Sequence, residues 1–328
     1  MVHKNRRQAV RALAGAAALA VLPLARAQAS WPRGPVKLVV PFPAGGSTDA
    51  FARLLARKLS DSLGQPFVVD NKPGANGNIG AGFVASAPAD GNTLMLSTTG
   101  PLSVNKLLYK STPFDPQKDF TPIALLADVP LLVACHPSLP VKDLKELIAY
   151  LKANPHQVSY STGGNGSMGH LSAELLQRAT GTSMIHVPYK GSAGALTDLV
   201  AGVVKLSFDL VPTYLEQINA GKVRAIAVLG PQRTPSLPGV PTLQESGYKA
   251  VAVGWYGLVG PKGLPPAVVA SVNKVANEFL ASTEGRAQLQ TFGMGPIGGK
   301  PEALSAFVQS EMDKWRPIVE PLASTIMQ

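Results

Sequence analysis

The sequence predicts an α/β protein built as two lobes. Short apolar runs typical of buried strands alternate along the chain with amphipathic stretches typical of helices, and Gly- and Pro-rich turns join them. This alternation favours parallel-rich sheets covered by helices on both faces. About 300 residues remain after an N-terminal leader, which is enough for two domains that each have a core.

Residues 1–29 have the composition of an export signal. A basic head precedes an apolar stretch that is too short to span a bilayer comfortably. Small-x-small patterns predict cleavage after Ala27 or Ala29. Arg6 and Arg7 resemble a twin-arginine signal, but the flanking residues depart from its usual pattern and leave the general secretory route open. We therefore predict an exported protein.

Removal of this leader changes the charge of the chain. The formal net charge is +10, and the leader holds basic but no acidic residues, so about +5 remains after cleavage. A mild basic bias of this size attracts anions. The remaining lysines and arginines are scattered and form no stripe, so we expect no nucleic-acid partner.

The first alternating unit extends to residue 109. We expect strands at residues 36–41, 67–70 and 93–97. We expect helices at residues 47–63, 79–86 and 105–109. The stretch 112–122 is punctuated by Pro and Asp and is expected to be irregular.

A second alternating unit follows, and the chain then returns to the first. We expect strands at residues 131–135, 158–161, 184–187, 204–209, 225–229 and 251–258. We expect helices at residues 144–151, 168–179, 192–201, 214–220, 266–282, 284–292 and 301–318. These elements assign residues 30–128 and 247–328 to lobe 1 and residues 129–246 to lobe 2, with crossings near 127–131 and 247–254.

The turn after the first strand is the central candidate for a binding site. Ser47 or Thr48 is placed to cap the following helix, and Asp49 suits its positive first turn. Gly45 and Gly46 leave the backbone open, so that N–H groups at the helix start can reach an anion. The turn predicts a grip on a carboxylate, and the alternative is an ordinary strand–helix connection.

Two further Gly-rich turns, at 161–170 and 187–194, also follow strands and precede helices. In the first, Thr162, Asn165 and Ser167 supply polar side chains. Ligands of open α/β sheets collect at the carboxyl ends of strands, so two lobes that present such loops to each other form a cleft with donors on both walls. No nucleotide fingerprint or phosphate-binding loop accompanies these turns.

Asp209 ends a predicted strand, where cleft residues are expected. Its carboxylate is suited either to hold a ligand amine or hydroxyl or to cap the next helix, and the sequence leaves both roles open.

Catalytic and metal sites are not indicated. Ser167 lies near His170, but a nucleophile elbow would need Gly where Asn165 stands, and no acidic partner is evident. The histidines are dispersed and lack zinc-ligand spacing. Cys135 is the only cysteine and lies in an apolar strand, so we expect a buried, inert thiol. We therefore expect no enzyme activity, no metal and no cofactor.

A series of short motifs runs along the whole chain in order. They are Pro41-Phe42-Pro43-Ala44-Gly45-Gly46-Ser47-Thr48-Asp49, Asn71-Lys72-Pro73-Gly74-Ala75-Asn76-Gly77, Ala89-Asp90-Gly91-Asn92-Thr93-Leu94, Asp119-Phe120-Thr121-Pro122-Ile123, the 161–170 loop, Val187-Pro188-Tyr189-Lys190-Gly191 and Trp255-Tyr256-Gly257-Leu258. By these motifs the chain resembles the periplasmic solute receptors of tripartite tricarboxylate transporters, also called Bug-type receptors.

This resemblance implies a two-lobed periplasmic binding protein of the Venus-flytrap kind, type II-like, with two hinge strands. In such receptors the loop after the first strand and facing loops of the other lobe hold a ligand carboxylate, largely through backbone amides and ordered waters. The ligand-binding residues that it implies are Phe42, Pro43, Ala44, Gly45, Gly46, Ser47, Thr98, Thr99, Thr162, Gly163, Gly164, Asn165, Gly166, Ser167, His170, Lys190, Gly191, Ser192 and Asp209. Asp209 is the residue expected to tune selectivity.

The resemblance also implies a mechanism and partners. A di- or tricarboxylate, an amino acid or an aromatic acid would be captured by closure of the lobes and delivered by a monomeric receptor to the subunits of a membrane transporter. Two alternatives remain at this stage: a secreted α/β hydrolase, and a receptor that serves a sensor kinase instead of a transporter.

Overall fold

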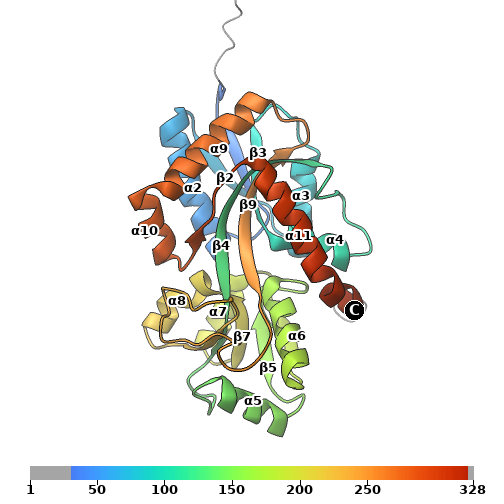
Figure 1. The fold of residues 1–328 in the computed structure, drawn as a ribbon, viewed down its shortest axis with the longest axis vertical. Coiled ribbons are helices and arrows are strands. Elements are labelled where there is room, and N and C mark those ends of the chain that lie inside the picture. The colour runs from blue at the N-terminus through green and yellow to red at the C-terminus, as the bar shows by residue number, and fades with distance from the viewer. Residues whose placement is uncertain (1–30, 324–328) are drawn as a thin grey trace, which may run out of the picture.

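A computed structural model describes residues 31–323 and shows a curled sheet in two halves, upper and lower in Figure 1. The export signal predicted at 1–29 lies outside the described residues. The strands follow the order β2-β1-β3-β9-β4-β7-β5-β6, and β8 and β10 pair with β4. Within residues 31–323, each helix is too short or too polar to cross a bilayer.

The upper half contains the first strands and the C-terminal helices. Its strands are β1 (Val36–Val40), β2 (Phe67–Asn71), β3 (Thr93–Thr98), β9 (Val253–Pro261) and β10 (Gly295–Pro296). Its α-helices are α2 (Ser47–Leu63), α3 (Asn78–Ala85), α4 (Asn105–Leu108), α9 (Pro266–Ala281), α10 (Thr283–Thr291) and α11 (Pro301–Val319). A π-helical turn, Gly100–Val104, leads into α4. In β1, only Lys37 is exposed, because helices cover both faces of the strand.

The lower half contains the second alternating unit. Its strands are β5 (Ser159–Thr162), β6 (Ile185–Pro188), β7 (Leu206–Leu210) and β8 (Arg224–Val228). Its helices are α5 (Leu144–Ala153), α6 (Met168–Thr180), α7 (Ser192–Val200) and α8 (Val211–Asn219). Helix α8 begins three residues earlier than its apolar spacing indicated, with a proline in its first turn.

Strands β4 (Phe120–Cys135) and β9 connect the halves and lie side by side in Figure 1. The part of β4 up to Pro130 pairs with β9, whereas its last five residues pair with β7 and β8. The prediction of an irregular stretch at 112–122 is therefore wrong at its end, and the strand predicted at 131–135 is the second part of β4. A register shift between Pro122 and Ala124 accommodates the proline, which cannot donate a ladder hydrogen bond.

The sheet is mixed. The pairs β1–β2, β1–β3, β5–β6 and β5–β7 are parallel, as alternating strands and helices predict. The antiparallel pairs involve β4 or β9, the strands on which the chain passes between halves. The prediction of a two-lobed α/β fold with two connecting strands is confirmed, and the description of its sheets as parallel-rich holds only away from β4 and β9.

The two halves share part of a core. Trp315 of α11 and Leu108 of α4 pack into the cluster of the lower half, together with Tyr160 and Phe208. The upper half has a separate cluster under α2 and α9. Apolar contact therefore links the two halves on the side of α4 and α11.

Candidate functional site

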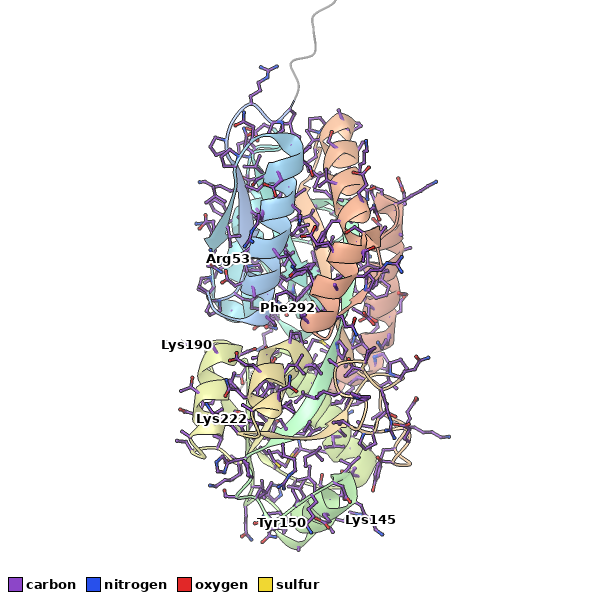
Figure 2. All side chains as sticks on the ribbon, turned by 90° about the vertical axis from the view of Figure 1, so that its left-hand side faces the viewer. Arg53, Lys145, Tyr150, Lys190, Lys222 and Phe292 are labelled. Atoms are coloured by element: carbon purple, nitrogen blue, oxygen red, sulfur yellow. The ribbon has the colours of Figure 1, made fainter. Side chains whose placement is uncertain are left out.

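A cavity of about 250 Å³ lies between the two halves, at loops that follow β1, β3, β5, β6 and β7. From the upper half it is lined by Phe42, Pro43, Ala44, Gly46, Ser47, Thr48, Asn76, Thr98, Thr99, Gly100, Gly254, Trp255 and Tyr256. From the lower half it is lined by Gly163, Ser167, Met168, Gly169, Lys190, Gly191, Ser192, Ala193, Gly194, Asp209 and Leu210. In Figure 2, Arg53 lies on α2 in the upper half, and Lys190 lies at the top of the lower half.

The upper wall is the start of α2. The N-cap is Gly46, with φ −84° and ψ 170°, and no side chain caps the helix. The prediction that Ser47 or Thr48 caps it is wrong, because both hydroxyls bond instead to the Tyr256 hydroxyl, at 3.2 and 3.3 Å. First-turn N–H groups of a helix have no intrahelical acceptor, so this start presents free donors to the cavity.

Asp49 holds the shape of that turn from behind. Its carboxylate accepts from the Gly45 N–H at 3.1 Å, from the Arg53 guanidinium at 3.0 Å and from the Asn71 amide at 3.0 Å. Burial alone would raise the pKa of Asp49, but these hydrogen bonds outweigh it and hold that pKa below its usual value. Gly45 is therefore a support of the loop, and it does not line the cavity.

Tyr256 of β9 lines the cavity next to the start of α2. Its ring is fully buried and stacks on Phe51 of α2 at 5.4 Å, and burial raises the pKa of its hydroxyl to about 12. Ser47 also accepts a hydrogen bond across the cleft from Thr213 of α8 at 3.3 Å. This hydroxyl cluster joins α2, the connecting strand and the lower half.

The first lower loop, between β5 and α6, is shaped by two histidines, of which His170 is buried and His186 half-buried. Ser167 caps α6 by accepting from the His170 N–H at 3.3 Å, and His170 Nδ1 accepts from the Gly166 N–H at 3.2 Å. The His170 and His186 rings stack at 3.8 Å, and Thr162 Oγ1 lies 2.7 Å from His186 Nε2. These groups hold the loop from inside the lower half.

Burial keeps both imidazoles neutral. It lowers the pKa of His170 to about 4, and burial together with the neighbouring His170 lowers the pKa of His186 to about 3. His170 Nδ1 is an acceptor, and the Ser167 hydroxyl is used by the helix cap, so the pair is not arranged as base and nucleophile. Among the described residues, no three His, Cys, Asp or Glu side chains gather as metal ligands.

The second lower loop leads into α7. Its N-cap is Gly191, at φ 118° and ψ 163°, and α7 has no side-chain cap. Only glycine adopts that backbone conformation readily, and a Cβ there would lie 3.0 Å from Cγ of Pro43, across the cleft. The start of α7 therefore faces the loop that precedes α2. Its first-turn N–H groups are a second set of donors without intrahelical acceptors at the cavity.

Asp209 is the last residue but one of β7 and lies beside the start of α7. The residue is only 5% exposed, and its Oδ1 accepts from the Leu210 N–H at 2.7 Å. Its Oδ2 has no hydrogen-bond partner in the described chain. Helix α8 has no side-chain cap, so the carboxyl is free for another role. Burial raises the pKa of Asp209 to about 6, against the lowering effect of the nearby Ser192 hydroxyl and the Leu210 N–H.

The cavity brings together a large part of the predicted site. The predicted residues at its surface are Phe42, Pro43, Ala44, Gly46, Ser47, Thr98, Thr99, Gly163, Ser167, Lys190, Gly191, Ser192 and Asp209. Gly164 and Asn165 line an adjoining hollow with Tyr189. Gly45, Thr162, Gly166 and His170 lie behind the walls. As ligand contacts, all of these remain predictions.

Other residues at the cavity are not among those predicted as ligand-binding from the sequence. Trp255 and Tyr256 belong to a recognised motif, but their position under the cavity depends on the pairing of β9 with β3 and β4. Asn76, at φ 50°, donates from Nδ2 to the Gly166 carbonyl at 2.9 Å, across the cleft. The signal available in the sequence was an asparagine in a Gly-rich turn, because Asn tolerates the left-handed backbone conformation.

The cysteine lies apart from this site. Cys135 ends β4, is fully buried, and burial raises the pKa of its thiol to about 11. Such a thiol stays protonated at neutral pH and is a weak nucleophile. The prediction of a buried, unreactive cysteine agrees with this position.

Comparison with known proteins gives matches along nearly the whole chain. A family model described as "Tripartite tricarboxylate transporter family receptor" matches residues 51–323. BugT of Bordetella pertussis is 40% identical over 295 residues, 88% of this chain and 90% of that protein. A structure of R. palustris Rpa4515 with adipate covers 89% of this chain and 98% of its own at 40% identity, with a TM-score of 0.87. MatC from Rhodopseudomonas palustris with bound malate covers 88% and 100% at 33% identity, with a TM-score of 0.83.

Proposed function

The chain belongs to the tripartite tricarboxylate transporter receptor family, and on that premise we propose that it captures a small carboxylate in the cavity between its halves. Family relatives with adipate and malate support a carboxylate ligand. The observation that carries the proposal is that two uncapped helix starts, those of α2 and α7, line one cavity from opposite sides.

The charges of the walls fit an anion that is held by backbone groups. The loop at 42–48 contains no Lys or Arg, and Lys190 is an exposed residue at the cavity. Aligned peptide dipoles give a helix start partial positive charge, and its free N–H groups point at a bound anion. A carboxylate at the start of α2 would therefore be held without a buried cation, and ordered water would fill the remaining space.

Closure of the halves completes the site. A ligand that touches both walls stabilises the closed arrangement only by the contacts that it makes there. Two hydrogen bonds already cross the cleft, Asn76 to Gly166 and Thr213 to Ser47, and β4 and β9 provide the connections about which the halves would move. The pairing of β4 with β9 up to Pro130, and with β7 and β8 beyond it, supports the proposed lobe boundaries near residues 128 and 247.

Export and delivery belong to the same proposal. The basic and apolar leader at 1–29 fits cleavage and release into the periplasm, and a location there suits a receptor of a membrane transporter. We expect a monomer that docks onto membrane transporter subunits and catalyses no reaction. Capture of a sensor-kinase ectodomain in a pull-down, with no transporter subunit, would assign the receptor to signalling instead.

Ligand binding is tested by thermal unfolding with a panel of carboxylates and their uncharged esters or amides. A carboxylate at about a hundred times its Kd adds about 2.7 kcal/mol to the free energy of unfolding, and its uncharged analogue adds less. Stabilisation by neutral sugars alone would contradict the proposal. Turnover of an ester panel that is lost in Ser167→Ala would establish a hydrolase in its place.

A matched pair of variants tests the backbone grip. Ser47→Ala and Ser47→Pro both remove the hydroxyl, but only proline removes the first N–H of α2. Proline suits this first helical position, and the conformation of Gly46 is compatible with a following proline. We expect Ser47→Pro to bind carboxylates at least about tenfold more weakly than Ser47→Ala, because a hydrogen bond to a charged group is lost. Equal affinities would show that the start of α2 does not hold the ligand.

A further inference from the structure

The lower wall contains a buried acceptor that lacks a donor. Oδ2 of Asp209 has no hydrogen-bond partner in the described chain, although its residue lines the cavity and is 5% exposed. The charged residues that line the cavity in the described structure are Asp209 and Lys190, and Lys190 is exposed. A buried, unpaired oxygen is costly unless a ligand or a proton satisfies it.

An anion site lies next to that oxygen. Helix α7 has nine residues, begins at Ser192 without a side-chain cap and lines the cavity through residues 191–194. A Cβ built on Gly163 would lie 3.2 Å from Oγ of Ser192 and 3.7 Å from Oδ2 of Asp209, so these two side chains lie together over Gly163. An anion at the start of α7 would therefore lie beside the Asp209 carboxyl.

These two observations assign a role to Asp209. We propose that Asp209, in its protonated form, donates a hydrogen bond from Oδ2 to the second carboxylate of a dicarboxylate ligand, and that this carboxylate lies at the start of α7. This inference rests on the proposed function, in which the first carboxylate lies at the start of α2. Capture then takes up one proton from solvent, which remains on Asp209 while the ligand stays fully ionised.

The surroundings of Asp209 favour a shared proton over a charge pair. The titratable groups that face it are Tyr214 of α8 and Tyr256 of β9, both fully buried with raised pKa values, and Tyr189 lies beyond Tyr214. The Tyr214 hydroxyl is engaged with Ser207, and that of Tyr256 with Ser47 and Thr48. Ser192 on α7 is neutral, so no buried cation offsets a second negative charge.

Proton uptake follows from this arrangement. Two carboxylates that share a buried site cannot both ionise without repulsion, so one of them binds a proton. The pKa of Asp209 is about 6 with the cavity empty, so its carboxyl is largely ionised at neutral pH. The approaching dicarboxylate raises that pKa further, and the protein binds a proton as it binds the ligand. As long as the ligand itself stays fully ionised, affinity is therefore highest where Asp209 is already protonated, and it declines as the pH rises above 6.

Titration calorimetry between pH 6.5 and 8.5 tests the proposal, with straight-chain dicarboxylates from succinate to suberate as probes. For the tightest of these we expect Kd to rise by up to about tenfold per pH unit, with close to one proton taken up per ligand in buffers of different ionisation enthalpy. The monoamide of the same acid, whose second end carries no charge, is expected to keep its affinity over this range.

Variants assign the proton to its residue. Asp209→Asn keeps a hydrogen-bond donor and is expected to bind the dicarboxylate with no dependence on pH. Asp128→Asn is the matched control, because Asp128 of β4 is another carboxyl whose pKa is raised by burial, but it lies outside the cavity. We expect that variant to keep the pH dependence of the unmodified protein. Ser192→Pro should weaken the dicarboxylate more than Ser192→Ala does, and it should affect the monoamide less.

The outcomes separate the inference from its premise. Binding of monocarboxylates or amino acids with affinity equal to that of every dicarboxylate, or a Kd for the dicarboxylate that is independent of pH, would overturn the inference and leave the proposed function intact. An unchanged pH dependence in Asp209→Asn would also overturn it. A protein that binds no carboxylate of any class would overturn the proposed function itself.

Discussion

The two walls of the cavity are built differently. The upper wall offers backbone N–H groups at the start of α2, and its one buried carboxylate, Asp49, is fully paired behind the loop. In the lower wall, the buried carboxyl of Asp209 has an unpaired oxygen, and the neutral imidazoles of His170 and His186 lie behind the wall. The upper wall is thus suited to hold any carboxylate, whereas the proposed role of Asp209 would make the lower wall the one that distinguishes between ligands and responds to pH.

The difference is also one of packing. A side chain at Gly46 of the upper wall would have no neighbour closer than 4.0 Å, whereas a Cβ at Gly169 of the lower wall would lie 2.1 Å from the Phe208 carbonyl oxygen. Tight packing makes the lower wall sensitive to small changes.

The largest effect is expected from Gly169→Ser. Its Cβ clashes with the backbone of β7, so α6 must move away from the sheet, and we expect a loss of about 3 kcal/mol in the free energy of unfolding. The same change in the upper wall, Gly46→Ser, supplies a favoured N-cap residue and should alter stability by less than about 0.5 kcal/mol. Urea denaturation measures both, and similar losses in the two variants would contradict the contrast.

Acid is expected to lower the free energy of unfolding through His170, which lies behind the lower wall. An exposed imidazole has a pKa near 6.5, whereas buried His170 has a pKa of about 4, so only the unfolded chain binds a proton between these values. Stability is therefore constant above about pH 6.5 and falls as the pH drops, by about 2 kcal/mol at pH 5 from His170 alone. His170→Phe removes this titration, and an unchanged slope of unfolding free energy against pH in that variant would refute the assignment.

Gly191→Ala is expected to hinder closure of the two walls on the ligand. The new Cβ would lie 3.0 Å from Pro43, and alanine is strained at φ 118°, so closure is hindered and ligand affinity should fall about tenfold. Gly181→Ala is the control, because Gly181 also has a positive φ but has open space around it at the end of α6. That control should lose stability and keep its affinity in calorimetry. Equal affinities of the two variants would show that the contact with Pro43 does not matter.

The smallest effect is expected from Asn76→Gly. Glycine keeps the left-handed backbone but removes the hydrogen bond to the Gly166 carbonyl, which spans the cleft. One hydrogen bond contributes about 1 kcal/mol, so closure weakens and Kd should rise about fivefold. Asn92→Gly, which removes only the local bond from Asn92 Nδ2 to Asp90, should leave Kd unchanged. A similar loss in both variants would argue against a bond between the walls.

Local patterns in the sequence predicted the elements of the fold better than the contacts between them. Helix α2 begins at Ser47 and ends at Leu63 as its apolar spacing indicates, because that spacing is set within a few residues. The length of β4 was missed, because Pro and Asp near residue 120 conceal a strand that forms by pairing with β9, far away in the sequence.

The candidate site shows the same limit. Gly-rich turns after strands are local features, and they indicated both helix starts. The role of Ser47 was assigned incorrectly, because its partner Tyr256 is 209 residues away, and no local pattern encodes that contact. Asp209 was singled out by its place at a strand end, but its unpaired oxygen depends on how α7, α8 and β9 pack around it.

The central claim is that two helix starts facing each other across one cavity capture a carboxylate. Mass spectrometry of small molecules released from the natively purified protein tests it most directly. The account predicts a compound with a carboxylate group, and a dicarboxylate if Asp209 acts as proposed. Release of a neutral compound alone, such as a sugar without an acid group, would contradict the claim.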